Sequence, residues 1–153
     1  MKFYKNFILF TIINFSALAI GSWLMNNGPK TQWYTNLNQA PWSPPGWVFG
    51  IAWSVIMLLF SAFMSYLIQV DRSKKVLALF GAQLMLNIFW NYLFFNKHLI
   101  IIGLLSLLFL TFLMLYFLIA YNNKIKNKRF FVLPYCIWLV LATSLNLYIA
   151  LHN

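Results

Sequence analysis

The sequence predicts an all-α membrane protein, a five-transmembrane-helix bundle with a long structured loop between the first two helices. The chain of 153 residues is 63% hydrophobic and 8% charged, which leaves too little polar surface to cover a soluble globule. Five apolar segments each have about 20 residues, enough at about 1.5 Å per residue to cross a hydrocarbon core of roughly 30 Å. Basic residues gather in alternate connectors. We expect spans at residues 6–25, 46–69, 76–95, 99–121 and 130–151, within a single domain of residues 1–153.

The first span has one alternative interpretation, a cleavable signal peptide. Lys2 and Lys5 precede the apolar run, and Ala17-Leu18-Ala19 resembles a cleavage site. However, the apolar run continues as far as Met25, which is long enough to cross a membrane. The length of the run therefore favours a transmembrane helix.

The connector between the first two spans (residues 26–45) is unusually aromatic. The stretch from Trp33 to Trp53 holds four of the seven tryptophans and three of the five prolines. At the end of the connector, Ser43 is a candidate helix cap, and Pro44 and Pro45 suit a first helical turn. A protein that merely crosses a membrane needs no such segment, so we interpret it as a loop that covers the entrance of a ligand-binding cavity.

Polar and aromatic side chains recur on particular faces of the spans. An amide in hydrocarbon must find a hydrogen-bond partner or face an aqueous cavity, so these faces should point into the bundle. The second span contributes Trp53, the third Gln83, Asn87, Trp90, Asn91 and Phe94, and the fifth Trp138, Ala142, Leu145 and Asn146. Pro134 lies near the start of the fifth span, where the helix either begins or kinks.

These faces predict an aromatic-walled cavity beneath the connector. Trp53 and Trp138 lie deep in their spans, and the small Ala142 leaves space between them. Such a lining suits a flat, largely apolar ligand with a few polar groups. Two alternatives stay open. Tryptophans near span ends often anchor a protein at the membrane interface. Asn87, Asn91 and Asn146 could instead join helices by hydrogen bonds.

The distribution of charge predicts the orientation. The net charge is +10, and nine of the eleven basic residues precede the first span or lie in the loops after the second and fourth spans. The positive-inside bias then places the N-terminus in the cytoplasm and the C-terminus outside the cell membrane. Anionic lipid headgroups are a sufficient partner for these charges, and nucleic acid is not indicated.

The sequence gives little support for acid–base, nucleophilic or metal-assisted catalysis. Asp71 is the sole acidic residue, so the chain has no carboxylate pair, and it has no nucleophile beside a base and no metal-ligand cluster. We expect no metal site and no required cofactor. His98 and His152 lie at span ends, where axial haem ligation is an alternative. We interpret the single cysteine, Cys136, as a small buried hydrophobic residue.

Three separated motifs resemble the translocator protein family, whose bacterial members are called tryptophan-rich sensory proteins. The first runs from Trp33-Tyr34 through Ala40–Gly46 to Trp53. The second and third lie on the third and fifth spans, and the resemblance covers essentially the whole chain. The second motif comprises Gln83, Leu86-Asn87, Trp90-Asn91 and Phe94-Phe95. The third comprises Leu133-Pro134-Tyr135, Trp138, Ala142 and Leu145-Asn146.

The resemblance implies a five-helix bundle, commonly a homodimer, whose cavity binds porphyrins and similar hydrophobic ligands. The matching pocket residues are Tyr34, Pro44, Trp53, Trp90, Asn91, Phe94, Trp138, Ala142 and Leu145, with Asn87 and Asn146 as further candidates. Some bacterial members of the family degrade protoporphyrin IX in light, which implies such a role for Trp53 and Trp138 here. Leu141 replaces the usual phenylalanine before the helix-five alanine.

Three functions remain open: a receptor or sensor for tetrapyrroles, a light-dependent porphyrin-degrading protein, and a transporter of such ligands. The sequence has no intramembrane charge that would mark a coupling-ion site, which disfavours the transporter. Sterol binding is also disfavoured. The sterol-recognition pattern needs a basic residue after Tyr148, and residues 149–153 contain no Lys or Arg.

Overall fold

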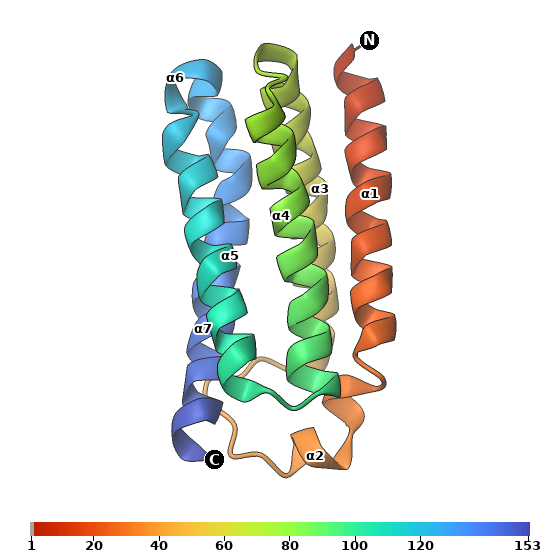
Figure 1. The fold of residues 1–153 in the computed structure, drawn as a ribbon, viewed down its shortest axis with the longest axis vertical. Coiled ribbons are helices and arrows are strands. Elements are labelled where there is room, and N and C mark those ends of the chain that lie inside the picture. Colours follow the sequence, from red (N-terminus) through yellow and green to blue (C-terminus); the bar gives the residue numbers. More distant parts are fainter. Residues whose placement is uncertain (1) are drawn as a thin grey trace.

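The computed structural model describes residues 2–153, and five long helices stand side by side in it, with their directions alternating (Figure 1). The N-terminus lies at one end of the bundle, and the C-terminus and the connector lie at the other. The long helices are α1 (Lys2–Leu24), α3 (Gly46–Val70), α4 (Lys74–Asn91), α5 (Ile100–Ala120) and α7 (Leu133–His152). Short helices are η1 (Gly28–Lys30), α2 (Gln32–Thr35), η2 (Tyr92–Asn96), α6 (Asn122–Ile125) and η3 (Lys126–Val132). The predicted all-α five-helix architecture is confirmed.

The structure decides where α7 and α3 begin and how the third span ends. α7 begins at Leu133, with Pro134 in its first turn, so the proline starts this helix and does not kink it. Pro45 takes the N-cap position of α3 and no side chain caps that helix, so the predicted serine cap at Ser43 is wrong. The third span is continued beyond Asn91 by η2, one turn of π-helix.

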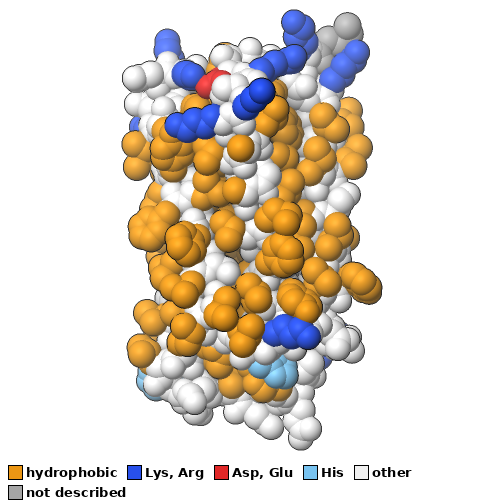
Figure 2. All heavy atoms as spheres, in the orientation of Figure 1, with side chains coloured by type: hydrophobic (Ala, Val, Ile, Leu, Met, Phe, Trp, Pro, Cys, Tyr) orange, Lys and Arg blue, Asp and Glu red, His pale blue; other side chains and the backbone are white. Residues whose placement is uncertain are grey.

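The outer surface of the bundle is apolar, as a membrane-spanning protein requires. All five long helices are long and apolar enough to cross a membrane. On the face drawn in Figure 2, an apolar belt crosses the middle of the molecule, and Lys and Arg side chains gather above it. Large exposed side chains include Ile12, Trp23, Leu58, Phe109, Phe112 and Ile119. Together these features make the chain a multi-pass membrane protein.

Polar side chains, by contrast, are buried between the helices. Asn14 on α1 is fully buried and donates a hydrogen bond to Oγ of Ser61 on α3, 2.9 Å away. Gln83 on α4 is also fully buried and accepts a hydrogen bond from Tyr135 on α7. These bonds give partners to Nδ2 of Asn14 and Oε1 of Gln83, which would be costly next to lipid, while Oδ1 of Asn14 and Nε2 of Gln83 make no bond to residues 2–153.

The helices form a closed ring with one loose seam. α1 packs closely against α3 and α4, and α5 packs closely against α4 and α7. α3 and α7 approach each other more loosely along their lengths. Aromatic side chains fill this seam, since Trp53 and Phe60 of α3 both pack against Tyr135 of α7.

Candidate functional site

The α3/α7 cluster (Phe49, Trp53, Tyr135 and Trp138) occupies the loose seam. Trp53 meets Tyr135 edge to face, with ring centroids 5.7 Å apart. It meets Trp138 in the same way at 6.5 Å, and Phe49 meets Trp138 at 5.3 Å. The two deepest predicted tryptophans are therefore brought together, on helices that are distant in sequence.

The space predicted between Trp53 and Trp138 is occupied by the indoles themselves. Their rings touch edge to face, so a flat ligand fits between them only if one indole moves. The prediction that the small Ala142 leaves space between these two rings is therefore wrong for this conformation. A hollow of about 370 Å³ lies nearby in the same seam, lined by Ala52, Val55, Ile56, Pro134, Ile137 and Trp138.

A second aromatic group, the α4 cluster (Trp33, Tyr34, Trp90, Phe94 and Phe95), joins α4 to the connector. Trp90 and Phe94 stack with centroids 5.8 Å apart, and Trp33 meets the edge of Phe94 at 5.6 Å. Tyr34 packs against Phe94 and Phe95. The single π-turn of η2 carries both phenylalanines, and it turns these rings toward the connector.

The predicted asparagines are occupied by hydrogen bonds within the bundle. Asn146 on α7 accepts a bond from Nε1 of Trp90 at 3.3 Å and donates one to the carbonyl of Ile100 at 3.1 Å. Asn87 donates to the hydroxyl of Tyr135 at 3.1 Å. Asn91 donates to the carbonyl of Asn87 in its own helix. The bonds of Asn87 and Asn146 favour the interpretation that these two asparagines join helices, whereas that of Asn91 stays within α4.

The remaining predicted residues are distributed between the fifth span and the connector. Ala142 and Leu145 are buried on α7, where Ala142 belongs to the main core. Pro44 lies half-buried in the connector just before α3. Burial raises the pKa of the Tyr34 hydroxyl, so this group remains a protonated hydrogen-bond donor at neutral pH.

The connector is fastened to the bundle at three points. Asn38 exchanges hydrogen bonds with the C-terminal residues, donating through Nδ2 to the carbonyl of His152 and accepting at its own carbonyl from Asn153. Nε1 of Trp42 donates to Oγ of Ser144 on α7 at 3.1 Å. The ring of Trp33 stacks on His98, with centroids 3.9 Å apart. The connector is therefore a fixed roof over this end of the bundle.

One buried polar atom in the α3/α7 cluster has no protein partner. Nε1 of Trp138 is shielded from solvent and makes no hydrogen bond to any residue among 2–153. An unpaired buried N–H is costly, and such groups are rare in native proteins. A bound molecule with an acceptor oxygen would satisfy it.

Sequence reasoning missed several contacts of this region. Phe49 lies on the same side of the second span as Trp53, and Tyr135 belongs to the third family motif, but their contacts in the α3/α7 cluster follow from neither pattern. The sequence suggests only haem ligation for His98, which lies stacked on Trp33. Its φ of 57° cannot be read from the sequence. Asn14 shares the first span with Thr11 and Ser16, and no spacing signal distinguishes it from them.

Comparison with known proteins agrees with this architecture. The family model described as TspO/MBR family matches residues 8–152. The chain is 31% identical to a tryptophan-rich sensory protein of Cereibacter sphaeroides, over 75% of this chain and 73% of the relative. It is 29% identical to a tryptophan-rich protein TspO of Archaeoglobus fulgidus, over 90% and 92% of the two chains. It is 28% identical to the human translocator protein, over 90% and 83%. This chain is a membrane protein of the TspO/MBR family.

Proposed function

We propose that the protein is a membrane receptor that binds porphyrins and similar flat hydrophobic molecules at the α3/α7 cluster. The observation that carries the proposal is the buried, unpaired Nε1 of Trp138 beside the ring of Trp53. A tetrapyrrole offers a large π-surface for both indoles, and its carboxylate side chains offer acceptor oxygens. No additional cofactor is needed, since the porphyrin is the ligand itself.

Binding in this way requires the cluster to open. The indoles of Trp53 and Trp138 are in contact, so the ligand must replace their contact with contacts to its own ring. α3 and α7 pack only loosely against each other, so a small displacement of these two helices would open the seam to a ligand. The fixed connector then closes the site from above.

The binding proposal is tested by titrating the purified protein with protoporphyrin IX and following the porphyrin absorbance. Trp138→Phe removes the N–H group and keeps an aromatic ring, and Ala142→Thr adds bulk beside the cluster. We expect both variants to bind several-fold more weakly. Trp47→Phe is the matched control, because Trp47 is 70% exposed on the outer face of α3. Unchanged affinity in both site variants would overturn the proposal.

Light-dependent degradation of the bound porphyrin is a second candidate function. It is favoured by the direct contact of two indoles, since an excited macrocycle held there would have two adjacent oxidisable rings. The test is to illuminate the complex of the variant that carries both Trp53→Phe and Trp138→Phe, at porphyrin concentrations that saturate it. Product formation at the wild-type rate would exclude a role for these residues.

We propose that the basic end of the bundle faces the cytoplasm. Lys and Arg side chains gather at the end that bears the N-terminus, as the positive-inside bias requires (Figure 2). The C-terminus and the connector would then lie outside. Single cysteines at Ser73 and Asn36, introduced with Cys136→Ser, should react with an impermeant thiol reagent from the inside and the outside of the cell, respectively. The opposite labelling would reverse the orientation.

We also propose that the protein forms a homodimer in the bilayer, as the family resemblance implies. Gly81 on α4 has open space beside it, and its neighbours Ala78 and Ala82 are exposed, so this face allows another helix to approach closely. Light scattering of the detergent-solubilised protein should give twice the mass of one chain. A monomeric mass in mild detergent and in nanodiscs would contradict this proposal.

A further inference from the structure

A small hollow opens at the basic end of the bundle, opposite the connector. It has a volume of about 200 Å³ and lies where the last turn of α3 meets α6 and η3. Its lining comprises Tyr66, Val70, Lys124, Ile125, Lys126 and Lys128. Aromatic and aliphatic side chains therefore line the hollow together with three lysines, which is a lining suited to an amphiphile with an anionic head.

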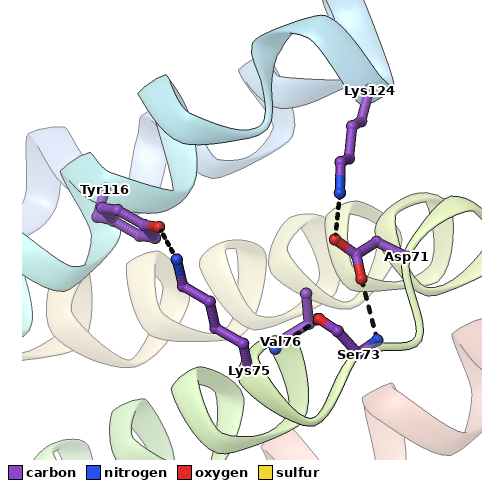
Figure 3. A network of polar contacts seen from close by, with 6 residues as sticks. All are labelled: Asp71, Ser73, Lys75, Val76, Tyr116 and Lys124. Carbon is purple, nitrogen blue, oxygen red and sulfur yellow. Dashed lines mark hydrogen bonds and ion pairs between the residues drawn. The ribbon is translucent and has the colours of Figure 1, made fainter.

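The protein itself supplies no free carboxylate to these lysines. Asp71 is the only acidic residue of the chain, and it forms an ion pair with Lys124 (Figure 3). It also accepts a hydrogen bond from the backbone N–H of Ser73. The bonds from Lys124 and Ser73 lower the pKa of Asp71 to about 2, so the pair is ionised at neutral pH. The anion that neutralises Lys126 and Lys128 must come from outside the chain.

Lys128 contacts the bundle through its side chain, and Lys126 has an unusual backbone conformation. The ammonium group of Lys128 lies over the ring of Tyr66, 4.8 Å from its centroid. That ring is itself packed between Phe3 and Phe131. Lys126 has φ 46° and ψ −126°, a backbone conformation that residues with a side chain rarely adopt. Strain of this kind persists only where the surroundings fix it, and it is frequent at ligand-binding positions.

The position of the hollow matches the level of lipid headgroups. Tyr66 and Val70 lie in the last turns of α3, the second membrane-spanning helix, and the lysines follow α5, the fourth. In Figure 2 a group of basic side chains lies directly above the apolar belt. A phospholipid that places its chains along this belt would bring its phosphate to the same level as the lysines.

We propose that this hollow is a binding site for the headgroup of an anionic phospholipid, with the phosphate held between Lys126 and Lys128. The charge pattern argues against a zwitterionic lipid. Such a headgroup carries a cation beside its phosphate, and the one carboxylate of the chain is already engaged by Lys124. All of the charged side chains that line the hollow are lysines, which suits an anionic headgroup.

The test is native mass spectrometry of the full chain in detergent, titrated with phosphatidylglycerol or with phosphatidylcholine of the same acyl chains. We expect one phosphatidylglycerol to bind in preference to phosphatidylcholine. The double substitution Lys126→Gln with Lys128→Gln should weaken that lipid roughly thirtyfold, since each lysine at an anionic headgroup contributes on the order of fivefold. Lys2→Gln with Lys5→Gln is the matched control, because it removes the same charge from the same end of the bundle.

A single substitution keeps the test valid if the double variant folds poorly. Lys126→Gly removes one lysine and relieves the unusual backbone conformation, and it should weaken the lipid about fivefold. Three results would overturn the proposal: equal binding of the two lipids, equal weakening in the hollow and control variants, or displacement of the lipid by millimolar inorganic phosphate. The last result would assign the hollow to a free phosphate ion.

Discussion

The hydroxyl of Tyr135 on α7 donates a hydrogen bond to Oε1 of Gln83 on α4, 3.0 Å away, at a fully buried position. The oxygen of the Tyr135 hydroxyl in turn accepts a bond from Nδ2 of Asn87, 3.1 Å away. One hydroxyl thus joins α4 to α7, although α5 packs between these two helices in the ring. This link lies beside Trp53, so the candidate site depends on it.

Replacing this hydroxyl should weaken the bundle. Tyr135→Phe leaves Gln83 and Asn87 without a partner, and we expect a loss of about 1–2 kcal/mol, because interhelical bonds in membranes are each worth about 0.6 kcal/mol and buried unpaired groups add a penalty. Thermal unfolding in detergent measures the loss. Tyr4→Phe is the control, since Tyr4 is 69% exposed and should leave the melting temperature unchanged.

Gly103 on α5 is predicted to tolerate no larger side chain. A Cβ atom there would lie 3.1 Å from Cβ of Phe94 and 3.5 Å from Oδ1 of Asn146. Gly103→Ala should therefore cost about 1 kcal/mol, because overpacking exceeds the usual gain of alanine in a helix. Gly50→Ala on α3 has open space around it and should instead stabilise the protein slightly. A stabilising effect at both positions would show that Phe94 moves freely.

The hydrogen bonds of Asn38 should decide how firmly the connector is held. Asn38→Ala removes the side-chain bond to the carbonyl of His152 and keeps the two backbone bonds to Asn153, while Asn36→Ala alters a nearby exposed asparagine that makes no such bond to α7. We expect faster amide hydrogen exchange in residues 32–45 of the first variant only. Equal exchange in both variants would mean that Trp33, Trp42 and the backbone bonds of Asn38 hold the connector without its side chain.

The ion pair of Asp71 predicts a pH dependence of stability at the basic end. The folded pKa is lowered to about 2 from 3.8, so the pair stabilises the protein fully above about pH 5 and ceases to do so as the pH falls toward 2. The effect should be small, because Lys124 is half exposed and salt screens the pair. The difference in melting temperature between the wild type and Asp71→Asn should disappear over this range. A difference that grows in acid would contradict the assignment.

The five spans were predictable because membrane-crossing length and hydropathy are properties of local sequence. The spacing of Gln83, Asn87 and Asn91 likewise predicts an inward-facing stripe, since a helix repeats every 3.6 residues. The partners of these amides were not predictable. They depend on how α4 and α7 approach each other, and the hydroxyl of Tyr135 reaches Asn87 only in the assembled ring.

The candidate site was predicted in its residues and not in its shape. Trp53 and Trp138 lie together as expected, yet their rings fill the space that Ala142 was expected to leave. Rotamers of buried indoles are set by the surrounding packing, and no spacing rule contains that information. The stack of Trp33 on His98 likewise depends on a left-handed backbone at His98, which the sequence does not specify.

The affinity of Trp138→Phe for protoporphyrin IX, measured beside that of Trp47→Phe, tests the central claim most directly. If the unpaired indole N–H of Trp138 receives the ligand, the first variant should bind about tenfold more weakly, which corresponds to one hydrogen bond of about 1.4 kcal/mol. The second variant should bind as the wild type does. Equal affinity of both variants and the wild type would contradict a ligand site at the α3/α7 cluster.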